Sequence, residues 1–288
     1  MPKHNVIIIG AGPAGISSAL YTQRAGIPTT VISKDAGTLM KAHKINNYYG
    51  FVEPIDGEVL ASNGMEQAKA IGVEFVDGEV VDISYNGHYI ISTASDAMQA
   101  DGVVIAMGAS KKSPNIDGLL RLEGSGVSYC AVCDAFFYRG KNVCVIGSSE
   151  YAKHEATELM PLANSVTVLA NGEDINADFE CDVISDKIHS IEGKDKVEKV
   201  LFENGKSIDT DGVFVAVGSA GSTEIARKMG IAVENGYIVT DENKSCGYPG
   251  LYAAGDCTGG LLQIAKAVYD GALAGTQLIK YIRSLGKE

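Results

Sequence analysis

Short apolar runs that end at a glycine recur along the chain, and helical spacing of apolar residues follows several of them. The first such run, NVIIIG, covers residues 5–10. A segment with helical periodicity follows up to about residue 24, and a second apolar run covers 29–33. The order of strand, tight turn, helix and strand predicts a βαβ unit in a parallel sheet.

This pattern occurs twice. Residues 5–33 match 142–170 without a gap, so that Gly10 aligns with Gly147. A second pair of buried strands agrees with this match, because DGVVIAMGA at 101–109 resembles DGVFVAVGS at 211–219. The repetition predicts an α/β chain with two Rossmann-like (βαβ) nucleotide-binding domains, the second inserted into the first.

The end of the chain has no match in the second copy. It reads as a strand and glycine turn at 250–260, followed by a helical run at 263–282. We therefore assign it to the first domain, which we expect to comprise 1–112 and 247–288, with 113–246 forming the second. The crossovers near 110–116 and 244–250 contain proline and polar residues, as hinges commonly do.

The first turn, GAGPAG at 10–15, has the glycines of a dinucleotide site. Gly10 makes the turn, Gly12 lets the backbone approach a pyrophosphate, and Gly15 permits close packing of helix on strand. Pro13 and Ala14 open the helix whose N-terminus would face the phosphates. An ordinary tight turn between strand and helix is the alternative.

Two further segments bear on this site. The acid that usually ends the second strand is replaced by Ser33, followed by Lys34, and a serine hydroxyl can still bond a ribose. In AAGD at 253–256, Gly255 and Asp256 suit a long ligand lying across the sheet, and Asp256 could bind a ribityl hydroxyl. Alternatively, Asp256 only caps the next helix. These features predict FAD.

Composition restricts the partners and the compartment. The 288 residues carry a formal net charge of −12, which argues against nucleic acid and anionic membranes as main partners. We find no apolar run of about eighteen residues and no signal peptide, so we expect a cytoplasmic protein. Its six cysteines should then be mostly reduced.

Cys130 and Cys133 form a closely spaced pair in SYCAVCDAFF. Such a pair can close to a disulfide and reopen by thiol exchange, and Asp134 directly after it could transfer a proton. One alternative is half of a zinc site, but the other four cysteines form no second close pair, and we expect no metal. The other is that Asp134 only favours a helix N-terminus.

With these motifs the chain resembles the low-molecular-weight thioredoxin reductases over nearly its whole length. The resemblance is carried by GAGPAG, CAVCD followed by FFYRGK, IAMGA with Gly108, and LYAAGD with the C-terminal helix. It implies a homodimer with FAD in the first domain and the dithiol in the second. It also implies that Cys133 meets the flavin, that Cys130 attacks the thioredoxin disulfide, and that Asp134 is the acid–base residue.

The same resemblance places Asn47 and Gln263 near the flavin. In the family, an Arg-Gln pair lies beside the flavin, and Leu262 occupies the position of that arginine here.

The second turn, GSSEYA at 147–152, departs from the family pattern. Ser149 replaces the second glycine, Tyr151 stands where a small residue is usual, and LANGEDINADF at 169–179 contains no arginine or lysine for an NADPH 2′-phosphate. Each lost charge-assisted contact costs roughly 1.5–3 kcal/mol. The segment also looks too short for the helix that bears those arginines in the family. We interpret the second domain as a dinucleotide fold that has lost its ligand.

This departure resembles the ferredoxin-dependent flavin thioredoxin reductases, and it implies ferredoxin as the electron donor. Three alternatives stay open: an NADPH- or NADH-dependent thioredoxin reductase, an enzyme with a second flavin or another small donor in the second domain, and a non-enzymatic FAD-binding sensor. A ferredoxin docking surface would need a basic patch on this acidic chain. Candidate pairs are Lys41 with Lys44, Lys111 with Lys112, and Arg139 with Lys141.

Overall fold

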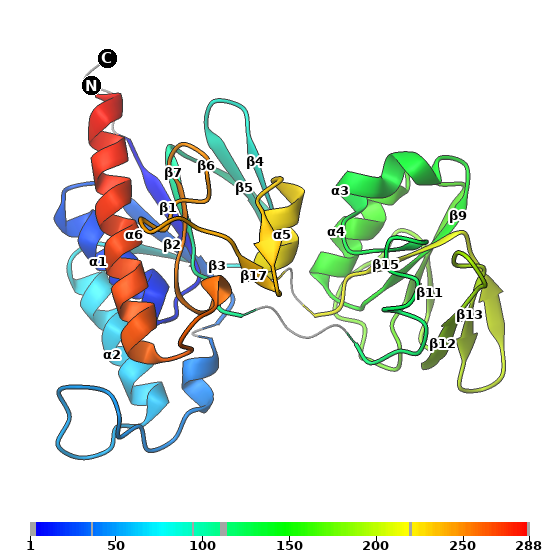
Figure 1. Ribbon diagram of the computed structural model, residues 1–288, viewed down its shortest axis with the longest axis horizontal. Helices are drawn as coiled ribbons and strands as arrows, with labels where there is room; N and C mark the ends of the chain where they lie inside the picture. The colour runs from blue at the N-terminus through cyan, green and yellow to red at the C-terminus, as the bar shows by residue number, and fades with distance from the viewer. Residues whose placement is uncertain (1–3, 36, 94, 110–113, 219–220, 287–288) are drawn as a thin grey trace. The chain divides into compact units, whose positions relative to one another are not determined.

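The computed structural model describes residues 4–35, 37–93, 95–109, 114–218 and 221–286, and it contains two compact units (Figure 1). The first unit comprises residues 1–110 and 221–288, and the second comprises 111–220. Of the crossover expected at 110–116, residues 110–113 lie outside the described residues.

The far boundary of the second unit lies earlier than we expected. Residues 221–246 belong to the first unit, not to the second. They pack there through α5 (Ser222–Lys228), where Lys228 Nζ donates a 3.2 Å hydrogen bond to the carbonyl oxygen of Val81. A composition rich in Pro and Gly near 244–250 marks a turn inside the first unit rather than its edge.

A five-stranded parallel sheet forms the centre of the first unit. Its strand order is β18-β7-β1-β2-β3, and every neighbouring pair is parallel. Three of these strands are almost entirely buried, as their runs of valine and isoleucine predict for a sheet covered on both faces. The strands are β1 (Val6–Ile9), β2 (Thr29–Ser33), β3 (Glu74–Asp77), β7 (Gly102–Ile105) and β18 (Leu251–Ala253).

Three long helices pack against this sheet: α1 (Pro13–Arg24), α2 (Gly57–Ala70) and α6 (Ile264–Leu285). Figure 1 shows α6, coloured orange to red, running beside α1. The approach of the two helices requires Gly271, because an added Cβ there would lie 2.0 Å from the carbonyl oxygen of Ala14. This contact places the C-terminal helix against the start of α1, where the first glycine turn lies.

The second unit repeats the arrangement. Its parallel sheet has the order β11-β10-β9-β15-β8. Strands β9, β10, β11 and β15 take the places of β1, β2, β3 and β7, and β8 takes the edge place of β18. The strands are β8 (Val127–Ser128), β9 (Asn142–Ile146), β10 (Ser165–Leu169), β11 (Asp182–Ile184) and β15 (Gly212–Val215). The predicted α/β fold with two Rossmann-like domains is confirmed.

Here the helix after the glycine turn, α4 (Glu150–Leu159), packs against α3 (Ala131–Asp134), the helix of the CxxC pair. The two equivalent helices of the repeat thus have different neighbours. In the first copy α1 packs against the C-terminal helix α6, and in the second copy α4 packs against the dithiol helix α3.

Each unit also carries a three-stranded antiparallel sheet, inserted in the chain between β3 and β7 in the first unit and between β11 and β15 in the second. In the first unit these strands are β4 (Val80–Tyr85), β5 (Tyr89–Thr93) and β6 (Ala97–Ala100), and in the second they are β12 (Ile188–Glu192), β13 (Lys199–Phe202) and β14 (Ser207–Asp209). The remaining elements are β16 (Val233–Glu234), β17 (Tyr237–Ile238), η1 (Thr38–Lys41), η2 (Ala135–Tyr138) and η3 (Gly255–Thr258). None of the helices in the described ranges has the length and hydropathy that a bilayer crossing requires.

Candidate functional site

The first glycine turn is open where a dinucleotide would approach. Gly10 has φ +109°, and an added Cβ would lie 2.4 Å from the carbonyl oxygen of Ala106, so only glycine fits. At Gly15 an added Cβ would lie 1.8 Å from the carbonyl oxygen of Gly10. At Gly12, in contrast, no protein atom lies within 4 Å of that position. The backbone is therefore accessible from outside just before α1 begins at Pro13.

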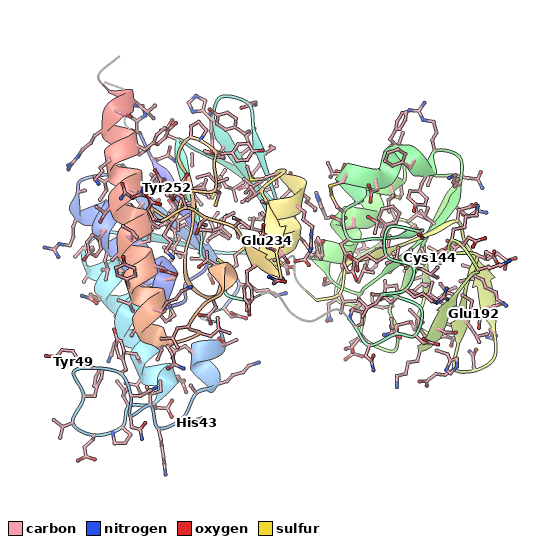
Figure 2. The ribbon with its side chains drawn as sticks, in the orientation of Figure 1. His43, Tyr49, Cys144, Glu192, Glu234 and Tyr252 are labelled. Atoms are coloured by element: carbon pink, nitrogen blue, oxygen red, sulfur yellow. A yellow bond between two sulfur atoms is a disulfide. The ribbon has the colours of Figure 1, made fainter. Side chains whose placement is uncertain are left out.

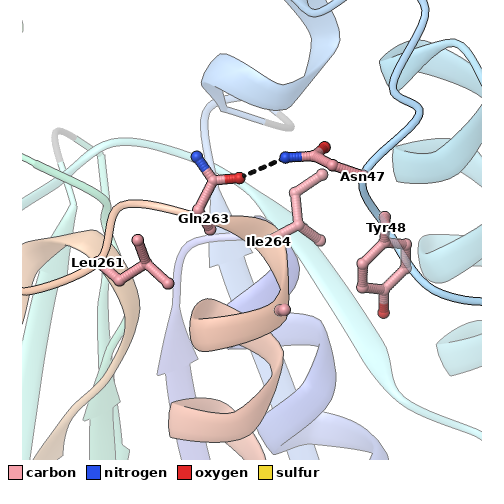
Figure 3. Close-up of a pocket in the computed structure, with 6 residues that line it drawn as sticks. Asn47, Tyr48, Leu261, Gln263 and Ile264 are labelled. Carbon is pink, nitrogen blue, oxygen red and sulfur yellow. Dashed lines mark hydrogen bonds between the residues drawn. The ribbon is translucent and has the colours of Figure 1, made fainter.

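One cavity adjoins this turn, and a second cavity shares Tyr48 and Ile264 with it as lining residues. One, of about 310 Å³, reaches Ala11 and Pro13 at the turn. The other, of about 290 Å³, is lined by Asn47 and Gln263. Figure 3 shows the amide of Asn47 directed at Gln263, with a 2.9 Å hydrogen bond from Nδ2 to Oε1. The fold thus joins two predicted residues that are far apart in sequence.

The segment at 255–258 is hydrogen-bonded to a buried carboxylate. Asp270, which is 1% exposed, pairs with Lys244 Nζ at 2.8 Å and with Lys266 Nζ at 2.7 Å. Its Oδ2 also accepts a 3.2 Å hydrogen bond from the N–H of Gly255. Burial by itself would raise the pKa of Asp270, but the bonds from both lysines outweigh it and lower the pKa. No motif in the sequence marks this carboxylate.

Asp256 lies beside this cluster. Burial raises its pKa, and the nearby charge of Lys266 offsets part of the effect. Gly255, with φ +85°, allows the chain to pass close to α1, because an added Cβ would lie 2.8 Å from Cβ of Ala14. The turn therefore presents Asp256 close to the start of α1.

Ser33, Lys34 and Gly108 lie at the carboxyl ends of β2 and β7, where ligands of such sheets bind. The hydroxyl of Ser33 donates to the carbonyl oxygen of Asp35. Lys34 Nζ pairs with Glu79 Oε2 at 2.7 Å. Glu79, which follows the neighbouring strand β3, supplies a carboxylate that the sequence pattern did not reveal. Gly108 follows β7 with φ +72°.

Cys130 and Cys133 form a disulfide, with their Cα atoms 5.3 Å apart. The Ser128 hydroxyl accepts a 3.1 Å hydrogen bond from the N–H of Cys130 and donates a 2.6 Å bond to Asp134 Oδ2. Cys130 is 6% exposed, whereas Cys133 is exposed. The pair and the carboxyl group expected to act with it therefore lie on one short helix.

A second carboxyl group contacts this helix and was missed in the sequence. Glu155 on α4 is 1% exposed, and its Oε2 accepts a 2.6 Å hydrogen bond from the N–H of Ala131. The available signal was its position, since it lies on the helix face that buries Tyr151, Ala152 and Leu159. An acid at an apolar position of an amphipathic helix indicates a specific partner.

The second glycine turn keeps the first glycine of GAGPAG and replaces the five residues after it. Gly147 matches Gly10, and an added Cβ would lie 2.2 Å from the carbonyl oxygen of Ala216. Ser149 takes the place of Gly12, and its hydroxyl donates a hydrogen bond to the carbonyl oxygen of Gly218. The N–H of Asn176 donates a 2.8 Å hydrogen bond to the carbonyl oxygen of Ser148. The chain's own groups thus occupy both sides of this turn.

The segment after β10 contains no helix, as its length suggested. Residues 170–181 instead run through turns and bends to β11. Glu173 and Asp174 in this segment are exposed. Tyr151 is 2% exposed, so its ring fills space inside the unit rather than projecting from the turn.

The other cysteines have burial that fits packing roles. Burial raises the pKa of Cys144 in β9 to about 11 and that of Cys257 to about 12 (Figure 2 labels Cys144). Cys246 is also buried, and Cys181 lies directly before β11. Within the described ranges, His, Cys, Asp and Glu form no cluster of three or more that could hold a metal ion.

Two dinucleotide-type folds, one with an open turn and one with a CxxC disulfide, define a disulfide oxidoreductase. The family model for pyridine nucleotide-disulphide oxidoreductases matches residues 4–271. Thioredoxin reductase of Listeria innocua is 34% identical over 98% of this chain and 95% of its own length. The chain therefore belongs to the thioredoxin reductases within that family.

Two solved structures are similar over the whole chain. The atypical thioredoxin reductase TRi from Desulfovibrio vulgaris Hildenborough has a TM-score of 0.94 at 36% identity, covering 98% of both chains. A ferredoxin-flavin thioredoxin reductase from Clostridium acetobutylicum has a TM-score of 0.75 at 32% identity, also covering 98% of both.

Proposed function

We propose that this flavin-dependent disulfide reductase uses FAD to pass electrons to the Cys130–Cys133 disulfide and on to thioredoxin, with reduced ferredoxin as its electron donor. The proposal includes a homodimer, as the family resemblance implies. The choice of ferredoxin as donor rests on the closed second turn, because a pyridine nucleotide would need to bind at that turn.

The residues of the first unit fit FAD. The space beside Gly12 would admit a pyrophosphate, and Asp256 stands close to the same turn for a ribityl hydroxyl. Asn47 and Gln263 line the adjoining cavity and offer amide groups to a flavin ring. Bound FAD would supply the chemistry that converts single electrons into a two-electron reduction.

The chain's own groups would then handle the sulfur chemistry. Reduction of the disulfide takes up two electrons and two protons and leaves two thiols. Asp134, which accepts a 2.6 Å hydrogen bond from the Ser128 hydroxyl, would give or take a proton at the sulfur of Cys133. Because Cys130 is 6% exposed, its attack on a protein disulfide requires this sulfur to become accessible after reduction.

Comparison of the two repeats supports the loss of dinucleotide binding in the second unit. At equivalent positions, Gly12 leaves space for a ligand, whereas Ser149 fills it and bonds Gly218. Opening this turn for a pyrophosphate would break that bond and the one from Asn176, at roughly 1 kcal/mol each. The acids Glu173 and Asp174 in the following segment would oppose a 2′-phosphate.

An anaerobic titration of the oxidised protein tests the donor. NADPH, NADH and reduced ferredoxin would be added in turn while flavin absorbance is followed. Bleaching by ferredoxin alone supports the proposal. Fast bleaching by either nicotinamide would identify the protein as a pyridine-nucleotide thioredoxin reductase. The similarity to thioredoxin reductases keeps this alternative open.

A basic patch near the flavin would serve an acidic ferredoxin. Lys41 and Lys44 are exposed and belong to the unit that holds the open turn. Replacing both with Gln should slow flavin reduction by ferredoxin and weaken its dependence on salt. Replacing the exposed Lys194 and Lys196 of the second unit with Gln is the control, and equal rates in all three proteins would reject this patch.

A further inference from the structure

A buried carboxyl group lies behind the disulfide. Glu155 on α4 is 1% exposed, and its bond donor Ala131 is fully buried. Burying a carboxylate is unfavourable unless hydrogen bonds compensate it, and an apolar side chain would cover the same helix face without that penalty. The position of Glu155 therefore calls for an explanation beyond packing.

Its contact reaches the backbone of the redox pair directly. The N–H that Glu155 accepts belongs to the peptide joining Cys130 to Ala131, at an N···O distance of 2.6 Å. On the other side, the N–H of Cys130 donates to the Ser128 hydroxyl at 3.1 Å. Both peptides flanking Cys130 are thus held by side chains, which fixes the direction in which its sulfur points.

A charge at this position also acts on the sulfur chemistry. Reduction creates a thiol that can ionise, and a nearby negative charge opposes the thiolate. Asp134 adds a second carboxyl group, which lies on α3 itself and accepts a hydrogen bond from Ser128. The energy of the reduced pair therefore depends on whether Glu155 carries its charge.

We propose that Glu155 is a positioning residue for the redox pair, orienting Cys130 through the Ala131 peptide and setting the reduction potential of the Cys130–Cys133 disulfide by its charge. This inference rests on the proposed redox role of that disulfide. It also explains why α4 persists in a copy whose turn is closed, since the helix now supports the dithiol instead of a nucleotide.

The test is an equilibrium with dithiothreitol, which needs neither ferredoxin nor thioredoxin. In this exchange the Cys130–Cys133 bond breaks and the dithiothreitol disulfide forms, so that two electrons and two protons pass between them. The FAD-loaded protein is equilibrated at graded ratios of reduced to oxidised reagent, quenched in acid and alkylated. The mass of the peptide containing both cysteines gives the reduced fraction.

Glu155→Gln keeps an acceptor oxygen and removes the charge. We expect its equilibrium to shift about tenfold toward the dithiol, which is a change of about 30 mV to a less negative potential. Glu158→Gln removes an exposed charge from the same helix and should shift the equilibrium less than twofold. A shift below twofold in Glu155→Gln as well would overturn the proposal.

Glu155→Asp separates orientation from charge, because it keeps the carboxylate and shortens its reach. We expect an equilibrium within about threefold of wild type and exchange with dithiothreitol that is about tenfold slower. If Glu155→Gln does not fold, this variant decides, and an unchanged exchange rate rejects the proposal. Since no donor or partner protein is used, the result is separate from the outcome of the ferredoxin titration.

Discussion

The hydroxyl of Ser149 donates a hydrogen bond to the carbonyl oxygen of Gly218, and it joins the second glycine turn to the chain that follows β15. In the first copy the equivalent residues are Gly12 and Gly108, and no side chain projects from Gly12 into the space between them. The closed turn therefore carries a side chain at the position where the open turn would admit a pyrophosphate, while the fold around it is kept.

Ser149→Gly should destabilise the protein without creating a nicotinamide site. We expect the free energy of unfolding to fall by about 1–2 kcal/mol, because one hydrogen bond is lost and glycine gains freedom in the unfolded chain. NADPH should still fail to bleach the flavin, since the bond from Asn176 to Ser148 and the acidic segment remain. Denaturant unfolding and an anaerobic titration measure the two effects.

The reciprocal change belongs in the first copy. Gly12→Ser should leave the fold intact, because no protein atom lies within 4 Å of an added Cβ, but it should weaken FAD binding at least about tenfold by occupying the pyrophosphate space. Gly15→Ala should instead destabilise the unit by about 3 kcal/mol through overpacking, as its Cβ would meet the Gly10 carbonyl oxygen. FAD retention on a desalting column and thermal unfolding separate the two. Equal FAD retention in Gly12→Ser and wild type would mean that the cofactor does not approach this turn.

Much of the fold could be predicted because periodicity and glycine position are local signals. The match of residues 5–33 to 142–170 predicts both βαβ units, and the strand pair at 101–109 and 211–219 predicts β7 and β15. The edge strand β18 lies within the strand predicted at 250–260, but its counterpart β8 could not be found, since it has only two residues. Pairing across a sheet is a tertiary property that so short a run does not encode.

In the candidate site, too, local features could be predicted and tertiary contacts could not. CxxC spacing identifies the disulfide, but nothing local reveals that Glu155 bonds the peptide after Cys130 or that Asp270 holds the turn at 255–258. These contacts join segments that only the folded chain brings together. The domain edge at 244–250 was placed too late for a related reason, because proline and glycine mark turns inside a domain as well as between domains.

Asp270→Asn should destabilise the first unit and loosen the segment that presents Asp256. Removing the shared partner of Lys244 and Lys266, which are 17% and 16% exposed, should reduce the free energy of unfolding by about 3 kcal/mol. Glu66→Gln breaks an exposed pair with Lys69 and should cost less than about 0.5 kcal/mol. Denaturant titration of both variants provides the comparison, and equal losses would contradict the structure.

The same carboxyl group predicts a pH dependence with a definite sign. Its pKa in the folded chain lies below the ordinary value of 3.8, so its ionised form stabilises the fold fully above that value. The stabilisation is lost as pH falls through the lowered pKa. The gap between wild type and Asp270→Asn should thus be constant from about pH 5 to 7 and narrow below about pH 4. A gap that widens on acidification would reverse this assignment.

Thiol labelling should follow burial. Burial raises the pKa of Cys144 to about 11 and that of Cys257 to about 12, so at pH 8 about one Cys144 thiol in a thousand is ionised, and fewer of Cys257. We expect iodoacetamide to modify the half-buried Cys181 at least about a hundredfold faster than either residue in the oxidised, folded protein. Timed alkylation with peptide mapping measures the rates. Rapid labelling of Cys257 would show that the 255–258 turn opens readily.

The two redox sulfurs should differ in what they trap. With Cys133→Ser, the remaining thiol of Cys130 should hold thioredoxin in a stable mixed disulfide, because the partner sulfur that would resolve it is absent. Cys130→Ser should trap little and should keep FAD bound, and both variants should lose at least about a thousandfold in thioredoxin reduction. Non-reducing electrophoresis and flavin absorbance report the outcome.

Since Cys133 is the exposed residue in the disulfide form and Cys130 is 6% exposed, the reverse pattern would reassign the attack to Cys133. In that case thioredoxin meets the pair as it lies in the oxidised structure, and no exposure of Cys130 is needed.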